Sequence, residues 1–95
     1  MISVWFQQGT EFDLEPEAMY GFRCMCAKAK EDVYITSGRE GDHMPGSLHY
    51  SGLAWDMRKS GYKTKADLYA VLPGGAGDWD IVEYDWGYHV EYDPA

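Results

Sequence analysis

The chain has 95 residues, a formal net charge of −8 and an aromatic content of 16%. This length predicts a single domain, residues 1–95, and the ordinary hydrophobic content argues against disorder. The negative charge argues against non-specific binding of nucleic acid, which needs a basic face, and against adhesion to an anionic membrane.

The beginning of the sequence carries no targeting signature. Residues 1–6 lack a basic region followed by a long apolar run, which argues against a secretory signal peptide. No apolar run reaches the length of a transmembrane helix, so no membrane insertion is expected. We therefore expect synthesis in the cytoplasm. Action in the periplasm, the cell wall or a virion would need another factor for delivery.

The first third of the chain predicts an edge strand followed by the main helix. Residues 1–6 are apolar and favour β-structure, whereas residues 7–13 are polar and predict a loop. A helix is expected over residues 14–31, because Pro16 suits a first helical turn and apolar residues recur at helical spacing. The expected buried stripe consists of Met19, Phe22, Cys26 and Ala29.

The two cysteines, Cys24 and Cys26, lie within this expected helix. Residues two apart on a helix point to different faces, so these side chains are not expected to pair. No second pair accompanies them, which also argues against a cysteine-bound metal.

The middle of the chain predicts two strands separated by a long loop. Strands are expected over residues 33–36 and 53–57, and residues 37–52 have loop composition. A polar turn at residues 58–63 follows. Thr64 is then expected to cap a short helix, with Asp67 completing an approximate capping box.

The last third predicts the end of this short helix and a hairpin. Leu68, Val71 and Leu72 form the expected apolar face, and residues 73–75 (Pro-Gly-Gly) end the helix. Residues 79–83 and 88–92 are expected to be strands on either side of a bend at residues 85–87. This order predicts an α+β fold with a small, mostly antiparallel sheet, one long helix and one short helix.

Three residues are candidate ligands for Zn²⁺: His49, Asp56 and His89. Imidazole nitrogen and carboxylate oxygen are donors that zinc accepts, and three protein ligands leave a fourth position for water or substrate. Gly52 allows a tight chain reversal between His49 and Asp56. His43 has two open interpretations, a residue lining this site or a solvated loop histidine.

A hydrolytic site also needs a proton acceptor, and the last segment offers three carboxylates. Glu83, Asp85 and Glu91 share sequence parity with His89, so in a continuous strand all would face one side. A bend at Gly87 would break this phase. Glu83 is the first candidate base and Asp85 the second, whereas Glu91 could hold a ligand or bind substrate.

Three segments resemble the zinc D-alanyl-D-alanine carboxypeptidase superfamily. They are residues 35–39 (ITSGR), residues 47–56 (SLHYSGLAWD, with the pattern S-x-H-x-x-G-x-A-x-D) and residues 88–92 (YHVEY). The superfamily includes vancomycin-resistance D,D-dipeptidases, phage L-alanyl-D-glutamate endolysins and the hedgehog signalling domain. The small size of the chain is similar to that of short phage-encoded members.

The resemblance implies a hedgehog-like α+β fold in which His49, Asp56 and His89 bind zinc. It also implies that Arg39 binds and polarises the substrate carbonyl or carboxylate, with Ser47 as a neighbouring substrate contact. The expected reaction is hydrolysis of a peptide bond in the peptidoglycan stem peptide. Carboxypeptidase and endolysin specificities both remain open.

Two positions depart from the family pattern. Many members carry the catalytic Glu three residues before the last ligand, where this chain has Trp86. Hedgehog-like members carry a Glu six residues before it, which Glu83 matches, and a His two residues before it, where this chain has Gly87. These departures favour a second hypothesis, a non-catalytic phage structural or adaptor protein that binds other virion proteins and keeps the fold, with or without the zinc.

Overall fold

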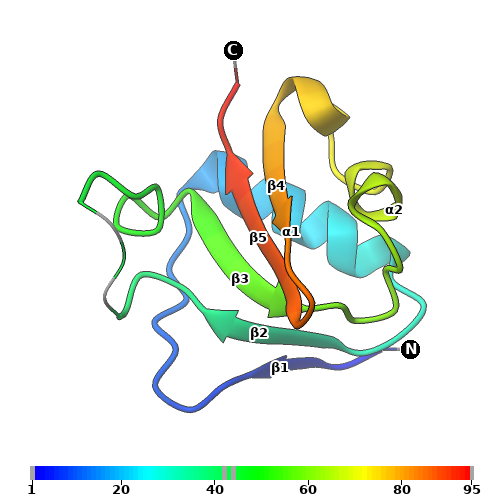
Figure 1. The fold of residues 1–95 in the computed structure, drawn as a ribbon, viewed down its shortest axis with the longest axis horizontal. Helices are drawn as coiled ribbons and strands as arrows, with labels where there is room; N and C mark the ends of the chain where they lie inside the picture. The colour runs from blue at the N-terminus through cyan, green and yellow to red at the C-terminus, as the bar shows by residue number, and fades with distance from the viewer. Residues whose placement is uncertain (1, 42, 44, 95) are drawn as a thin grey trace.

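The computed structural model describes residues 2–41, 43 and 45–94, which form a small α+β domain with a five-stranded mixed sheet (Figure 1). The strands in chain order are β1 (Val4–Phe6), β2 (Val33–Ser37), β3 (Ala54–Arg58), β4 (Trp79–Glu83) and β5 (Gly87–Tyr92). The helices are α1 (Pro16–Lys28), α2 (Lys65–Tyr69) and a short 3₁₀ segment, η1 (Gly75–Gly77). The α+β class expected from the sequence is therefore confirmed.

The strand order in the sheet is β1-β2-β3-β5-β4. Strands β1 and β2 are parallel, and the other three neighbouring pairs are antiparallel. The expectation of an edge strand at residues 1–6 is confirmed for Val4–Phe6, whereas Met1 lies outside the described residues. Helix α1 crosses one face of the sheet, behind the strands in Figure 1, and α2 packs beside β4.

Helix α1 begins at Pro16 and ends at Lys28, inside the expected range of 14–31. Its buried residues are Ala18, Gly21, Phe22 and Met25. The expected buried stripe was Met19, Phe22, Cys26 and Ala29. Only Phe22 is common to both sets, and each of the other buried residues comes one position before an expected one. The reason is Trp79: its buried ring lies directly over Gly21, where only a residue without a side chain leaves room. Both cysteines are free thiols.

The short helix α2 begins as expected. The Oγ1 of Thr64 accepts a hydrogen bond from the backbone N–H of Asp67 at 3.4 Å, which caps the first turn. Leu68 and Leu72 are buried against β4 and the core, whereas Val71 is half-buried. No helix in the described part of the chain is long and apolar enough to cross a membrane.

The hairpin between β4 and β5 closes with a two-residue turn, Asp85-Trp86. Tyr84 and Gly87 exchange backbone hydrogen bonds of 2.8 and 3.3 Å across it. Val82 consequently lies opposite His89, and Glu83 lies opposite Tyr88. Paired residues share a face, so the even-numbered residues of β4 face the same side as the odd-numbered residues of β5. The expectation that Glu83 and His89 share a face is therefore wrong.

The two faces of the sheet differ in chemistry. The face toward the helices carries the core, which includes Trp55 and Met57 of β3 and Tyr88 and Val90 of β5, all 0% exposed. The alternating residues of β3 and β5 therefore point to the opposite face, which no helix of the described residues covers (Figure 1). Residues 38–53, the site loop, fold over one end of this open face; positions 42 and 44 lie outside the described residues.

Candidate metal centre

The sheet register brings Asp56 and His89 together. They are directly paired across β3 and β5, so both side chains project from the open face. His49 joins them from a turn of the site loop in which the N–H of Gly52 donates to the His49 carbonyl. Gly52 has a φ of +73°, so it allows the chain reversal expected there. The His49 side chain is almost fully buried.

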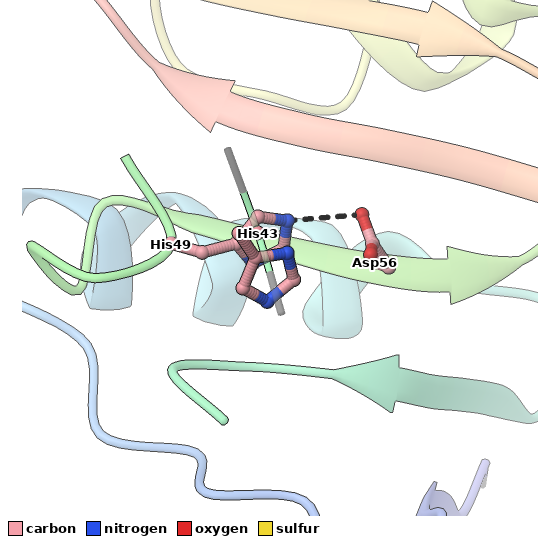
Figure 2. Close-up of side chains that lie close together, drawn as sticks. All are labelled: His43, His49 and Asp56. Atoms are coloured by element: carbon pink, nitrogen blue, oxygen red, sulfur yellow. Dashed lines mark ion pairs between the residues drawn. The ribbon is translucent and has the colours of Figure 1, made fainter. Parts of the chain in front are cut away.

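Three donor atoms from these residues face one another. The Nδ1 of His89 lies 3.0 Å from the Nε2 of His49 and 3.0 Å from the Oδ1 of Asp56. The third separation, between His49 Nε2 and Asp56 Oδ1, is 3.2 Å and is drawn as the dashed line in Figure 2. Tetrahedral zinc with bonds of about 2.0–2.1 Å places its ligand atoms about 3.3 Å apart. The spacing therefore suits a zinc-sized ion.

Outer hydrogen bonds orient both imidazoles. The Nδ1 of His49 is 2.9 Å from the carbonyl oxygen of Gly38, and the Nε2 of His89 is 2.6 Å from Oε1 of Glu91. A carbonyl and a carboxylate accept, so these outer nitrogens carry the protons. The inner nitrogens then present lone pairs toward Asp56. Three lone-pair-bearing atoms in mutual contact require a proton or a metal cation between them.

The titration of these groups reflects the same arrangement. Burial acts to raise the pKa of Asp56, but its contacts with the imidazoles of His49 and His89 outweigh burial and lower the pKa to about 2. Burial acts to lower the pKa of His89, but Asp56 and Glu91 on its two sides outweigh it, so the pKa is raised. The site thus holds a carboxylate that stays ionised and stabilises positive charge.

His43 also lies beside these donors, and His43, His49 and Asp56 together form a group that could hold a metal ion. One ring nitrogen of His43, one of His49 and one oxygen of Asp56 lie within 4.8 Å of one another (Figure 2). Two imidazoles on one zinc ion have ring centres about 5 Å apart. The His49 and His89 rings are 4.8 Å apart and inclined at 56°, whereas those of His43 and His49 stack at 3.8 Å and 5°. The ring geometry therefore favours His49 and His89 as the ligand pair.

An open cleft of about 500 Å³ lies over the donor atoms. The site loop lines one side with residues that include His43 and Ser47, and the β4–β5 hairpin lines the other with Val82, Tyr84 and Trp86. The described residues that line the cleft include no Lys or Arg. The donors are therefore open to a ligand from solvent, and the cleft provides no cationic side chain for a substrate carboxylate.

Arg39 does not lie in this cleft, contrary to its expected role as a substrate clamp. Its Nε donates to the carbonyl of Asp13 at 2.7 Å, and its Nη1 donates to the carbonyl of Tyr50 at 3.1 Å. Its Nη2 lies 3.2 Å from Oε1 of Glu15. These contacts tie the segment before α1 to the site loop. In this arrangement the guanidinium is used for bonds within the protein.

The expected bases Glu83 and Asp85 are not in the cleft either. The Glu83 carboxylate accepts from Lys59 Nζ at 2.9 Å and from the N–H of Lys65 at 3.0 Å. The hydrogen bond from Lys59, followed by that from Lys65, lowers the pKa of Glu83. Asp85 is exposed at the hairpin turn. Neither carboxylate lines the cleft, because Glu83 pairs with the buried Tyr88 on the other face of the sheet and Asp85 lies in the turn itself.

Ser47 and Glu91 do lie in the cleft, where the sequence hypothesis needs them. The Oγ of Ser47 accepts from the N–H of His49 at 3.2 Å, so it helps to fix the turn that carries this candidate ligand. Glu91 contacts His89, so it is placed to hold this candidate ligand.

Glu40 is a structural residue of the site that the sequence analysis missed. Its Oε1 accepts from the backbone N–H groups of Glu11 and Gly38, at 2.8 and 2.7 Å. Its Oε2 accepts from the hydroxyl of Ser37 at 2.8 Å. The spacing S-x-x-E from Ser37 to Glu40 is the signature of a reciprocal cap and was the available signal. Glu40 thus fixes the Gly38 carbonyl that orients His49.

Comparison with known proteins does not assign the chain to a family. No family model matches the chain, and no solved structure is significantly similar to it. The interpretation of the site therefore depends on the side chains themselves.

Proposed function

We propose that the protein binds zinc through His49, Asp56 and His89 and hydrolyses a peptide bond in peptidoglycan stem peptides. The observation that carries this proposal is the convergence of the three donor atoms at 3.0–3.2 Å on the floor of an open cleft. Two nitrogens and one carboxylate oxygen form a donor set typical of catalytic zinc.

The motif resemblance supports a place in the D-alanyl-D-alanine carboxypeptidase and hedgehog-like superfamily. The ligands follow the motif order S-x-H-x-x-G-x-A-x-D and then a histidine in the last strand. Asp56 and His89 are neighbours on the sheet face opposite the helices, and His49 enters from the preceding loop. A zinc ion in this position would act as a Lewis acid and lower the pKa of water.

The proton transfer that hydrolysis needs is assigned to His43. Glu83 and Asp85 lie outside the cleft, and Glu91 is bound to His89 at 2.6 Å. The Nε2 of His43 donates to the carbonyl of Glu40 at 2.7 Å, which leaves Nδ1 as the proton acceptor. Its ring is stacked beside the ligand His49 at the cleft wall.

The test is hydrolysis of purified peptidoglycan, followed as released D-Ala or stem-peptide fragments. Turnover is expected to require zinc and to fall about 10²–10⁴-fold in His43→Gln, which retains the zinc. Glu83→Gln is the matched control and should retain full activity, because Glu83 is paired with Lys59 on the other face. Full activity in His43→Gln would remove the proton-transfer role.

The second candidate is a non-catalytic phage structural or adaptor protein. It is favoured because both carboxylates that line the cleft are already in contact with His89. Among the described residues that line the cleft, the carboxylates are Asp56 and Glu91, and both contact His89. No carboxylate there is left over to serve as the usual base. Zinc bound by the native chain without turnover of any stem-peptide bond would support this candidate and contradict the peptidase.

A further inference from the structure

Exposed aromatic side chains form a row across the open face of the sheet. Trp5 of β1 pairs with Tyr34 of β2, and their rings stack 6.5 Å apart at 13°. The guanidinium of Arg58 in β3 lies 5.7 Å from the centre of the Tyr34 ring. Arg58 pairs with Gly87 of β5, which exchanges backbone hydrogen bonds with Tyr84. The row therefore extends from β1 to Tyr84, the residue after β4, and Gly87 of β5 contributes no side chain to it.

The rings of this row are available to a ligand. Trp5, Tyr34, Tyr84 and Trp86 are 40–54% exposed. Trp86 stacks on Tyr84 with ring centres 5.1 Å apart at 6°. Trp86 lines the metal cleft and also a second hollow that includes Tyr34 and Arg58. Tyr34 and Arg58 in turn line a third hollow with Trp5. Neighbouring hollows thus share lining residues, from Trp5 to the cleft over the donor atoms, and we call this series of hollows the aromatic groove.

We infer that the aromatic groove binds a polysaccharide strand, the glycan from which the stem peptide branches. Sugar rings have apolar C–H faces and a polar rim of hydroxyl groups. The groove offers the complementary pattern, aromatic faces separated by polar groups such as Arg58, Lys59 and Ser60. An uncharged polymer also suits a chain with a net charge of −8, whereas a polyanion does not.

The position of the groove fits a branched substrate. Arg58 and Gly87 lie two residues along their strands from Asp56 and His89, so the two rows are about 7 Å apart. Five adjacent strands give the aromatic row a length of about 19 Å, enough for several sugar rings. A glycan on this row would place its peptide branch toward the donors. The choice of peptidoglycan among glycans rests on the proposed function.

The experiment measures binding of soluble N-acetylglucosamine oligomers, an uncharged glycan without peptide, to the protein in the presence of a zinc chelator. Intrinsic tryptophan fluorescence is a suitable signal, because Trp5 and Trp86 are the exposed tryptophans, whereas Trp55 and Trp79 are buried. We expect saturable binding that weakens at least tenfold in both Trp5→Ala and Trp86→Ala. Tyr20→Ala is the matched control, an aromatic side chain that is 63% exposed on α1, and should bind as the native chain does.

Three results would overturn the inference. They are no saturable binding by the native chain, equal binding by all variants, or a concentration-dependent dimer that Trp5→Ala abolishes. The last result would make the row a contact between copies. Because the assay uses peptide-free glycan and no zinc, its failure leaves the hydrolysis test intact, and failure of hydrolysis leaves this binding test intact.

Discussion

His89 contacts two carboxylates, one on each ring nitrogen. Its Nδ1 faces Asp56 at 3.0 Å and its Nε2 faces Glu91 at 2.6 Å. Replacing Glu91 by Gln removes the charge that fixes the ring tautomer, so we expect zinc affinity to fall about 10–100-fold. Competition with a chromophoric chelator measures this change. Glu83→Gln, the same substitution on the other sheet face, should leave the affinity unchanged, and an equal loss in both variants would contradict the assignment.

Glu40 predicts an acid-sensitive site loop. Burial acts to raise its pKa, but hydrogen bonds from Glu11, Gly38 and Ser37 outweigh burial, so the folded-state pKa is lowered. The stabilisation is therefore complete above the unfolded pKa of about 4.3 and is lost as the pH falls through the folded value. Glu40→Gln should be about 1 kcal/mol less stable at pH 7.

Urea unfolding of the native chain and Glu40→Gln between pH 7 and pH 3 measures the difference in free energy of unfolding. The difference is expected to shrink toward acid pH. A difference that stays constant over this range would show that the charge of Glu40 has no stabilising role.

The motif identified the candidate ligands, but it could not place Arg39. His49 and Asp56 are close in sequence, and a glycine between them signals the reversal that joins them. Arg39 has the residue type of a substrate clamp, yet its guanidinium binds the carbonyls of Asp13 and Tyr50. Such contacts depend on how two loops meet, which residue type and spacing do not specify.

At the scale of the elements, the packing of α1 on the sheet depends on Gly21. A Cβ there would lie 2.0 Å from a ring carbon of Trp79, whose Nε1 is fixed by a hydrogen bond to the Pro73 carbonyl. Gly21→Ala should therefore destabilise the fold by about 1–3 kcal/mol, despite the better helix propensity of Ala. Thermal unfolding measures this. Gly77→Ala, with nothing within 4 Å of the added Cβ, is the control. Equal stability of the two variants would contradict this packing.

The positions of the helices and strands in the sequence were largely predictable. Which face of α1 and of β4 points toward the core was not. Composition and turn residues located the strands, α1 and the Thr64-capped α2 within a few residues. The phase of α1 depends on where Trp79 packs, and the phase of β4 depends on the two-residue turn at Asp85-Trp86. Both depend on tertiary packing, which local sequence does not specify. The two-residue turn places Glu83 on the face of the sheet opposite the site.

At the scale of the whole molecule, the sheet separates stability from binding. The helices and the buried face of the sheet form the core, whereas the donor atoms, the cleft and the aromatic groove share the open face. A small domain has limited core stability, so an ion held by three protein ligands should add measurably to it. Zinc at 100 times its dissociation constant would add about 2.7 kcal/mol.

The most direct test measures bound zinc and the zinc-induced rise in Tm for the native chain, His89→Ala and His43→Ala. Both variants remove an imidazole that lines the same cleft. The native chain and His43→Ala should each hold about one zinc ion per chain and gain several degrees in Tm. His89→Ala should lose both the metal and the stabilisation. Retention of zinc by His89→Ala with its loss from His43→Ala, or a native chain that binds no zinc at neutral pH, would contradict the account.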